Sequence, residues 1–294
     1  MVGLALEGGG SRGSYHIGVM KAFIEAEYNF SGFVGTSIGA INAAAFAQGD
    51  FKKAADMWTG ITTEQLFDAE FCKLLKIGES KWDLHNFTDA SQSLRKIIDE
   101  HGVDTSRIRE LIDDTISEEK MRSSGHDYGL VTVCINEMKP YELYIEDIEQ
   151  GELLSYISAS ACVPGFHPVV IGKNTFADGA LYNNCPINML INKGYKEIVA
   201  VRTKAPGVYR AVRAPKGVKI RKIVPKHDLG NVMIFDPKRI RENIAYGYRD
   251  GLEALREIRE PKEKLYPLSS LSSLPSLSSR RKTAKEHNSP ETDQ

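Results

Sequence analysis

The chain has 294 residues, of which 41% are apolar and 26% are charged, so it can bury the core of one large domain or of two small ones. Its net charge of −1 supplies no global basic field that would attract nucleic acid or anionic lipid, and we expect no nucleic-acid partner. No apolar run approaches the roughly 18–20 residues that span a bilayer, and the N-terminus lacks the basic and long apolar regions of a signal peptide.

The four cysteines lie far apart in the sequence, at Cys72, Cys134, Cys162 and Cys185. No C-x-x-C pair occurs, so this spacing favours buried free thiols over disulfides or a zinc site. We therefore predict a cytoplasmic protein, either free or peripheral at a membrane, and we expect it to use no metal and no cofactor.

Strands and helices alternate in the N-terminal part of the predicted fold. A strand over about residues 2–6 leads into the glycine-rich segment 7–13. A second strand over Phe30–Val34 precedes a run of helix formers over residues 38–46. The helix between the two strands is expected to bury Ile17, Met20, Ala22, Phe23 and Ile24. This order predicts a three-layer α/β/α domain with a mostly parallel central sheet.

Residues 50–125 are more polar and mostly helical in pattern, and a capped helix is expected to start near Thr105. Strand-like runs over Tyr128–Ile135 and Tyr141–Ile145 predict a hairpin. A helix over Leu153–Ala161, a strand over Glu197–Val201 and a final helix over Pro237–Arg259 complete the pattern. Large apolar residues in the helical region are expected to form either an apolar wall or lid or ordinary core: Trp58, Leu66, Phe67, Phe71, Leu74, Leu75 and Trp82.

The composition changes after about Lys262, where leucine recurs every third residue among serines and prolines. Period three drifts about 60° per step around an α-helix, but it keeps one edge of a polyproline II strand. We predict a folded domain over residues 1–260 and a disordered tail over residues 261–294. A docking segment for a partner or for the protein's own surface is the alternative.

The segment Gly35-Thr36-Ser37-Ile38-Gly39 has the G-x-S-x-G pattern of a nucleophile elbow. It stands between a predicted strand and a predicted helix, where a sharp turn leaves little room beside the serine, so glycines flank it. The turn would present the Ser37 hydroxyl at a helix N-terminus, where unpaired N–H groups favour developing negative charge. A turn of small residues without chemistry remains the alternative for this pattern.

The glycine-rich segment contains Gly8, Gly9, Gly10, Arg12 and Gly13. Consecutive glycines let backbone N–H groups approach a substrate oxygen closely, as stabilisation of an oxyanion requires. Arg12 is expected either to fix this loop or to meet a phosphate-bearing substrate. The segment also matches the G-x-G-x-x-G dinucleotide pattern, but the acidic residue expected at the tip of the second strand is missing.

A third motif is Asp178-Gly179-Ala180, which read alone is a common turn. Together the three motifs resemble the patatin-like phospholipase family, in which a glycine-rich oxyanion loop, a G-x-S-x-G serine and a D-G-G or D-G-A aspartate follow in this order. The segment Ala159–Phe166 is similar to the family's A-S-x-x-x-P-x-x-F pattern, and Asn184 and Pro186 follow the aspartate as in the family. The resemblance covers roughly residues 1–205, with Glu7 standing where many members have Asp.

The resemblance implies a patatin-like fold and a Ser–Asp dyad that cleaves carboxylic esters of lipids through an acyl-enzyme, as in phospholipases A or lysophospholipases. Ser37 would attack the acyl carbonyl, Asp178 would act as the base, and N–H groups of Gly9, Gly10 and Ile38 would hold the oxyanion. Partial burial of Asp178 would raise its pKa from about 3.9 and make it a better base at neutral pH. The expected partner is a lipid or phospholipid at a membrane or micelle surface, and the sequence does not identify a partner protein.

Two other functions remain open at this stage. An α/β-hydrolase triad would use Ser37, Asp178 and His227, which follow in the required chain order, although Ser37 comes early for that fold. His16 is expected either to line the pocket or to be structural, and His167 to pack or cap locally. A catalytically inactive lipid-binding scaffold is the second alternative.

Overall fold

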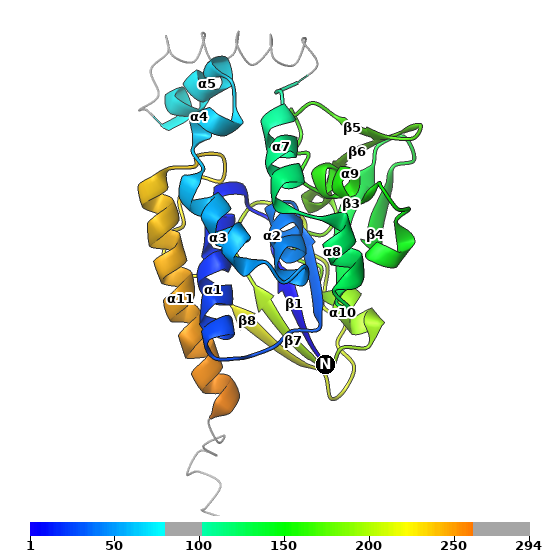
Figure 1. Ribbon diagram of the computed structural model, residues 1–294, viewed down its shortest axis with the longest axis vertical. Helices are drawn as coiled ribbons and strands as arrows, with labels where there is room; N and C mark the ends of the chain where they lie inside the picture. The colour runs from blue at the N-terminus through cyan, green and yellow to red at the C-terminus, as the bar shows by residue number, and fades with distance from the viewer. Residues whose placement is uncertain (80–101, 261–294) are drawn as a thin grey trace, which may run out of the picture. The chain divides into compact units, whose positions relative to one another are not determined.

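The computed structural model describes residues 1–79 and 102–260 (Figure 1). The chain divides into a compact unit, Met1–Arg256, and a second unit, Glu257–Gln294, of which the structure describes only residues 257–260. The tail predicted over residues 261–294, with its leucine repeat, lies outside the described residues, as does Trp82.

The core of the compact unit is one sheet with eight strands among the described residues. Five neighbouring strands run parallel, in the order β3-β2-β1-β7-β8, while β4 and β6 pair antiparallel with β3, and β5 pairs antiparallel with β6. The strands are β1 (Val2–Leu6), β2 (Gly32–Thr36), β3 (Asp127–Cys134), β4 (Lys139–Tyr144), β5 (Val169–Ile171), β6 (Asn174–Asp178), β7 (Glu197–Val201) and β8 (Lys219–Ile223).

Helices fill most of the connections between the strands. Short 3₁₀ turns at Gly10–Gly13, Ile145–Asp147 and Gly179–Leu181 accompany them. The α-helices are α1 (Ser14–Glu25), α2 (Ile38–Ala47), α3 (Phe51–Gly60), α4 (Thr63–Leu66), α5 (Ala69–Glu79), α7 (Ser106–Thr115), α8 (Glu118–Ser123), α9 (Leu153–Ser160), α10 (Ile187–Lys193) and α11 (Pro237–Arg259).

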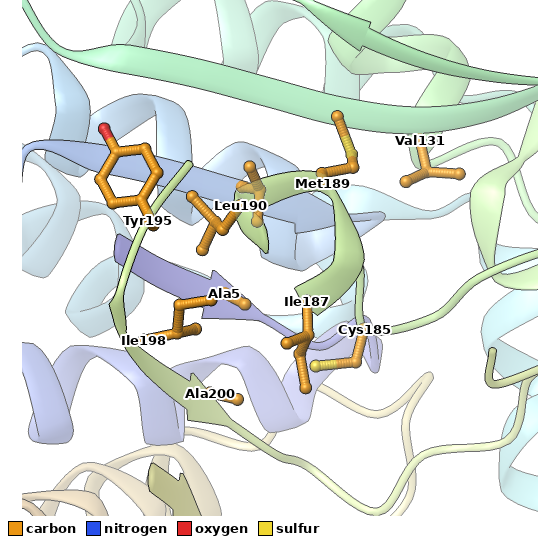
Figure 2. Packing of buried hydrophobic residues seen from close by; sticks show 10 residues of the cluster. Ala5, Val131, Cys185, Ile187, Met189, Leu190, Tyr195, Ile198 and Ala200 are labelled. Carbon is orange, nitrogen blue, oxygen red and sulfur yellow. The ribbon is translucent and has the colours of Figure 1, made fainter. Parts of the chain in front are cut away.

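The sheet is covered by helices on both faces, and Figure 1 shows α1, α2 and α11 grouped on one of them. On the other face α10 packs against β1, β2 and β7. Figure 2 shows the core there, where Leu190 of α10 lies near the Tyr195 ring and Met189 of α10 lies toward Val131 of β3, in one cluster with Ala5 and Ile198. The expected three-layer α/β/α architecture with a mostly parallel sheet is confirmed.

The strand order creates a crevice beside β1. Chain order runs from β1 through β2 to β3 in one direction and from β7 to β8 in the other. In parallel sheets, ligands bind outside the carboxyl ends of the strands where the order reverses. The loops that follow β1 and β7, residues 7–13 and 202–207, therefore start at the two sides of this crevice.

A second feature brings β2 and β6 end to end. Residues 129–131 of β3 pair with β2 on one edge and β4 on the other, while Thr132 pairs with Asp178 of β6 and Tyr141 of β4. Since β4 pairs with one edge of β3 from Gly129 to Cys134, β2 and β6 must both pair with the opposite edge of β3. The strand β2 ends at Thr36 beside Val131, and the antiparallel β6 ends at Asp178 beside Thr132. The residue after Thr36 is Ser37, so this register directs Ser37 and Asp178 toward each other.

The predicted elements agree with the structure except at some ends and for some short segments. The second strand is Gly32–Thr36 rather than Phe30–Val34, because the chain enters the sheet only after the aromatic turn at Tyr28 and Phe30. Ile24 was expected on the buried face of the first helix, but it is 40% exposed in the last turn of α1. All four cysteines are buried and free, as expected.

The backbones of α1 and α11 are in close contact on the face of the sheet that these two helices cover. A Cβ atom at Gly18 would lie 1.9 Å from the carbonyl oxygen of Ile244, and one at Gly247 would lie 2.1 Å from that of Tyr15. These distances leave no space for a methyl group at either crossing point. The long final helix is therefore fixed to the first helix by two glycines that the helical pattern alone does not explain.

We expect Gly247→Ala to destabilise the fold, because the added methyl group would force the two helix backbones apart. Overpacking of this kind costs about 1–3 kcal/mol, and contact with rigid backbone places the cost at the upper end of this range. Urea denaturation followed by circular dichroism measures the change in the free energy of unfolding.

Gly60→Ala is the matched control for this substitution. Gly60 is helical and exposed in α3, and a Cβ atom there meets nothing within 4 Å. The free energy of unfolding of the Gly60→Ala variant should equal that of the wild type or be slightly higher. Equal stability of the two variants would contradict the close helix contact.

Candidate active site

The predicted elbow forms a sharp turn between β2 and α2. Ser37 has φ 58° and ψ −130°, a left-handed backbone conformation that is strained for a residue with a side chain. A Cβ at Gly35 would lie 2.2 Å from the carbonyl oxygen of Gly39, and one at Gly39 would lie 2.4 Å from that of Leu6. Both flanking glycines are therefore required by close backbone contacts.

Asp178 ends β6 and is buried, with 1% of its surface exposed. Its Oδ1 atom accepts a hydrogen bond of 2.7 Å from the Ala180 N–H, which assigns a structural role to the turn Gly179–Leu181. Its Oδ2 atom is buried and has no hydrogen-bond partner of standard geometry among the described residues.

Burial raises the pKa of Asp178 to about 7, because an apolar environment disfavours the charged carboxylate. The Ala180 N–H and the Ser37 hydroxyl interact with the carboxyl group and lower its pKa, but burial is the larger effect. Hydrogen bonds at catalytic groups are often poorly aligned without substrate. This agrees with an interaction between Ser37 and Asp178 that does not meet standard hydrogen-bond geometry.

Ser160 holds the elbow from the side of β3. Its hydroxyl accepts a 3.0 Å hydrogen bond from the backbone N–H of Ser37 and donates a 2.6 Å hydrogen bond to the carbonyl of Val131. Ser160 is fully buried at the end of α9. The sequence indicated it only as part of the segment Ala159–Phe166, and its contact with the elbow required the structure.

Three backbone N–H groups around the serine have no hydrogen-bond acceptor among the described residues. They belong to Gly9, Gly10 and Ile38, while the neighbouring N–H groups of Gly8, Ser11 and Arg12 are bonded to Asn184, Val232 and Gly9. Gly9, Gly10 and Ile38 also line the same cavity as Ser37 and Asp178. Free N–H groups at this place suit a developing oxyanion, whereas the N–H of Gly8 is already occupied.

The structure places Arg12 in contacts with backbone. Its guanidinium donates hydrogen bonds of 2.7 Å to the carbonyl of Gly230, 2.7 Å to that of Lys204 and 3.3 Å to that of Thr203. The Gly13 carbonyl accepts a 3.0 Å hydrogen bond from Asn42. Of the two roles expected for Arg12, fixing the loop therefore matches its contacts.

A buried carboxylate also anchors the start of the glycine loop. Glu7 is fully buried and forms an ion pair with Arg202, while its Oε1 atom accepts hydrogen bonds from the Ala205 N–H at 3.0 Å and the Tyr209 hydroxyl at 2.8 Å. These donors come from the chain after β7. Glu7 therefore joins the loop after β1 to the loop after β7 across the crevice.

A cavity of about 420 Å³ opens at Ser37 and Asp178. Its lining is mostly apolar and comes from α2, α3, α4 and α7 and from the segments 161–166, 205–207 and 232–235. Trp58, Leu66 and Phe67 of the predicted apolar wall line it, and Phe71 packs against Phe67 with ring centroids 5.0 Å apart. The lining segments 205–207 and 232–235 were not predicted.

None of the four histidines in the described residues lines this cavity. His227 is exposed and stacks on Tyr246, with ring centroids 4.3 Å apart. His16 is buried beside Asn42, and burial lowers its pKa to about 3. The structure therefore brings Ser37 and Asp178 together but places His227 elsewhere.

In the part of the chain that the structure describes, no helix is both long and apolar enough to cross a membrane.

Comparison with known proteins identifies the family of this arrangement. A sequence model described as patatin-like phospholipase matches residues 4–191, a range that contains the glycine loop, the elbow and Asp178. The chain belongs to the patatin-like phospholipase family. The resemblance inferred from the three motifs is thereby confirmed, and the dinucleotide-binding alternative is set aside.

The relatives found by sequence are distant and mostly uncharacterised. The uncharacterized protein YjjU of Escherichia coli is 26% identical over 213 residues, which span 71% of this chain and 53% of that protein. The uncharacterized NTE family protein Rv2565 of Mycobacterium tuberculosis is 27% identical and the neuropathy target esterase sws of Drosophila melanogaster is 25% identical. The matches cover 74% and 68% of this chain but only 34% and 13% of those proteins.

Among solved structures, VipD from Legionella pneumophila has a TM-score of 0.49 at 14% identity, with coverage of 87% of this chain and 66% of that chain. The type III effector protein ExoU has a TM-score of 0.39 at 16% identity, with coverage of 87% of this chain and 52% of that chain.

We expect Asp178→Asn to raise the melting temperature at pH 8. The carboxyl group titrates near pH 7 when folded and near 3.9 when unfolded. Between these values the folded state binds the additional proton, so stability falls as pH rises through this window. Asparagine carries no charge, so the variant should gain on the order of 5 °C at pH 8 and little at pH 4, as measured by differential scanning fluorimetry.

Asp114→Asn makes the same chemical change at an exposed position of α7 and should leave the melting temperature unchanged at both pH values. A shift for Asp178→Asn that is equal at pH 4 and pH 8, or a loss at pH 8, would contradict the raised pKa of Asp178.

Proposed function

We propose that this chain is a serine hydrolase that cleaves the acyl ester bonds of lipids through an acyl-enzyme on Ser37, with Asp178 as the base. One observation carries the proposal. Ser37 and Asp178 meet at an apolar cavity that three unpaired backbone N–H groups also reach. This arrangement supports the proposal, because a nucleophile, a base, oxyanion donors and an acyl chain would all be needed at one place.

In the first half-reaction the Ser37 oxygen attacks the ester carbonyl while its proton passes to the Asp178 carboxylate. The carbonyl oxygen becomes an oxyanion held by N–H groups of Gly9, Gly10 and Ile38. The tetrahedral intermediate collapses, the carbon–oxygen bond to the alcohol breaks, and the proton on Asp178 passes to that alcohol. Ser37 then carries the acyl group.

In the second half-reaction a water molecule attacks the acyl-enzyme. Asp178 takes one proton from this water while the water oxygen bonds to the acyl carbon. The bond between the acyl carbon and the Ser37 oxygen then breaks, and Asp178 returns the proton to that serine oxygen. The products are a fatty acid and an alcohol, and the chain returns to its starting state. The mechanism requires no histidine, metal or cofactor.

The environment of Asp178 makes a carboxylate adequate as this base. A general base works best when its pKa lies near the working pH, and burial raises the pKa of Asp178 to about 7. The Ala180 N–H fixes Oδ1, so Oδ2 remains without a partner among the described residues and is the atom to receive the serine proton.

The apolar lining indicates the substrate class. Rings of Trp58, Phe67 and Phe166 and aliphatic side chains of α2 and α7 surround the space beside Ser37. Burial of each methylene of an acyl chain contributes about 0.8 kcal/mol. We therefore propose phospholipid or lysophospholipid esters as substrates, presented at a membrane or micelle surface.

A fluorophosphonate probe should label the wild-type protein and fail to label Ser37→Ala. With a mixed lipid extract, mass spectrometry should detect fatty acid and the deacylated lipid for the wild type alone. The Ser158→Ala variant is the control and should behave as the wild type, since the Ser158 hydroxyl donates to the Leu154 carbonyl within α9 and Ser158 does not line the cavity. An unreactive wild-type protein would favour the inactive lipid-binding scaffold.

His227→Ala should retain nearly all activity on a soluble nitrophenyl ester, whereas Asp178→Asn should lose at least about 100-fold, because general-base catalysis contributes about 10²–10⁴-fold. The kcat/KM of the wild type and of His227→Ala should both fall as pH drops below about 7, where Asp178 becomes protonated.

A histidine base would also titrate near neutral pH, so the pH dependence of the wild type alone does not distinguish the dyad from the triad. The same pH dependence in His227→Ala does distinguish them, because that variant lacks the histidine of the triad. Loss of activity in His227→Ala comparable to that in Ser37→Ala would overturn the dyad.

A further inference from the structure

One segment concentrates positive charge in a chain whose net charge is only −1. From Arg202 to Lys226 the sequence contains nine lysines and arginines and no aspartate or glutamate. Such a cluster produces a local positive potential that the overall composition conceals.

This segment forms the connection between the parallel strands β7 and β8. Such crossovers usually contain a helix, but here residues 202–218 have no helix and residues 206–217 are all exposed. The exposed part includes apolar side chains, with Val208 at 44%, Tyr209 at 40% and Val212 at 37% exposure. Exposed apolar residues among basic ones are typical of surfaces that bind a partner.

The cations of this segment differ in whether they have acidic partners. Arg202 pairs with Glu7, Lys219 with Glu197 and Lys226 with Glu253. By contrast, Lys204, Arg210, Arg213 and Lys216 are exposed and have no acidic partner within residues 1–79 and 102–260. These four define what we call the basic loop, residues 204–216.

The basic loop begins at the wall of the cavity. Ala205, Pro206 and Gly207 line the space beside Ser37 and Asp178. Hydrogen bonds from the Val208 N–H to the Ala180 carbonyl at 2.8 Å and from the Asn184 N–H to the Val208 carbonyl at 2.7 Å fasten the loop to the segment that follows Asp178.

The next part of the loop continues along the same segment. The Arg210 guanidinium stacks on the Tyr182 ring at 3.9 Å from its centroid. Leu181 lines the cavity and is nevertheless 50% exposed, which places it at the opening. Apolar surface at the opening and unpaired cations therefore lie on connected segments.

We propose that the basic loop docks this protein on a bilayer that contains anionic phospholipids, beside the opening of the cavity. The inference rests on the proposed lipid hydrolase function and adds the charge of the lipid surface. Anionic lipids attract clustered lysines and arginines near the surface, and apolar side chains among them enter the interface. A nucleic acid would use the charge but not the exposed valines or the adjoining apolar cavity.

The test measures binding without turnover, with the full chain carrying Ser37→Ala. This Ser37→Ala protein is sedimented with vesicles of phosphatidylcholine alone or of phosphatidylcholine with 30% phosphatidylglycerol. We expect binding to the anionic vesicles that weakens at high salt. Arg210→Glu/Arg213→Glu should reduce the partition coefficient more than tenfold, since each basic residue contributes about fivefold.

Arg249→Glu/Arg256→Glu is the matched control, with the same charge change on exposed residues in the C-terminal half of α11. Figure 1 shows that part of α11 at the end opposite α4, whose Leu66 lines the cavity. The control should bind anionic vesicles nearly as the parent does. A second variant, Arg213→Glu/Lys216→Glu, leaves the Arg210–Tyr182 stack intact and should also lose binding.

A second assay measures hydrolysis of a soluble nitrophenyl ester by proteins that keep Ser37. It distinguishes failure of this docking proposal from failure of the proposed hydrolase function. The loop variants should keep that activity, whereas an inactive wild type would refute the hydrolase and leave the vesicle result to stand alone. Equal binding to both vesicle types, equal loss in the α11 control, or binding to nucleic acid without binding to vesicles would overturn the docking surface.

Discussion

The site depends on two strands that end on the same edge of β3. The parallel strand β2 and the antiparallel strand β6 approach along this edge from opposite directions and stop beside Val131 and Thr132. Neither strand can extend further without colliding with the other. The chain must therefore turn away sharply at Ser37 and at Asp178, and both turns leave a polar side chain at the junction. The strained backbone of Ser37 follows from this register.

A second constraint holds the glycine loop in place while two of its backbone N–H groups stay unpaired. The glycine loop is held by the groups around it: Glu7 binds the chain after β7, Arg12 bonds three carbonyls, and Ser11 donates to Val232. Burial of an ion pair is costly unless its remaining hydrogen-bonding capacity is filled, and the additional donors to Glu7 meet this condition. The N–H groups of Gly9 and Gly10 are thus fixed in place while they remain unpaired, as the oxyanion role proposed for them requires.

Local patterns in the sequence were sufficient for the elbow, the glycine loop and the order of the long elements. Each depends on residues within about ten positions, such as the glycines around Ser37. The meeting of Ser37 with Asp178 came from the family resemblance, because a register across β3 leaves no local signal. The same holds for Ser160, for the role of Glu7 and for the lining at residues 205–207 and 232–235. No prediction included the strands β5, β6 and β8 or the helix α10.

The contacts of the glycine loop also govern when the site can form during synthesis. The loop spans residues 7–13, yet its Ser11 hydroxyl bonds the carbonyl of Asn231, 220 residues later. The α1 helix likewise meets α11 at Gly247. Domains assemble as the chain leaves the ribosome, and contacts of such long separation form late. During synthesis the serine elbow can therefore form well before the glycine loop acquires its contacts, because the loop is fixed only once residues 231–247 have been made.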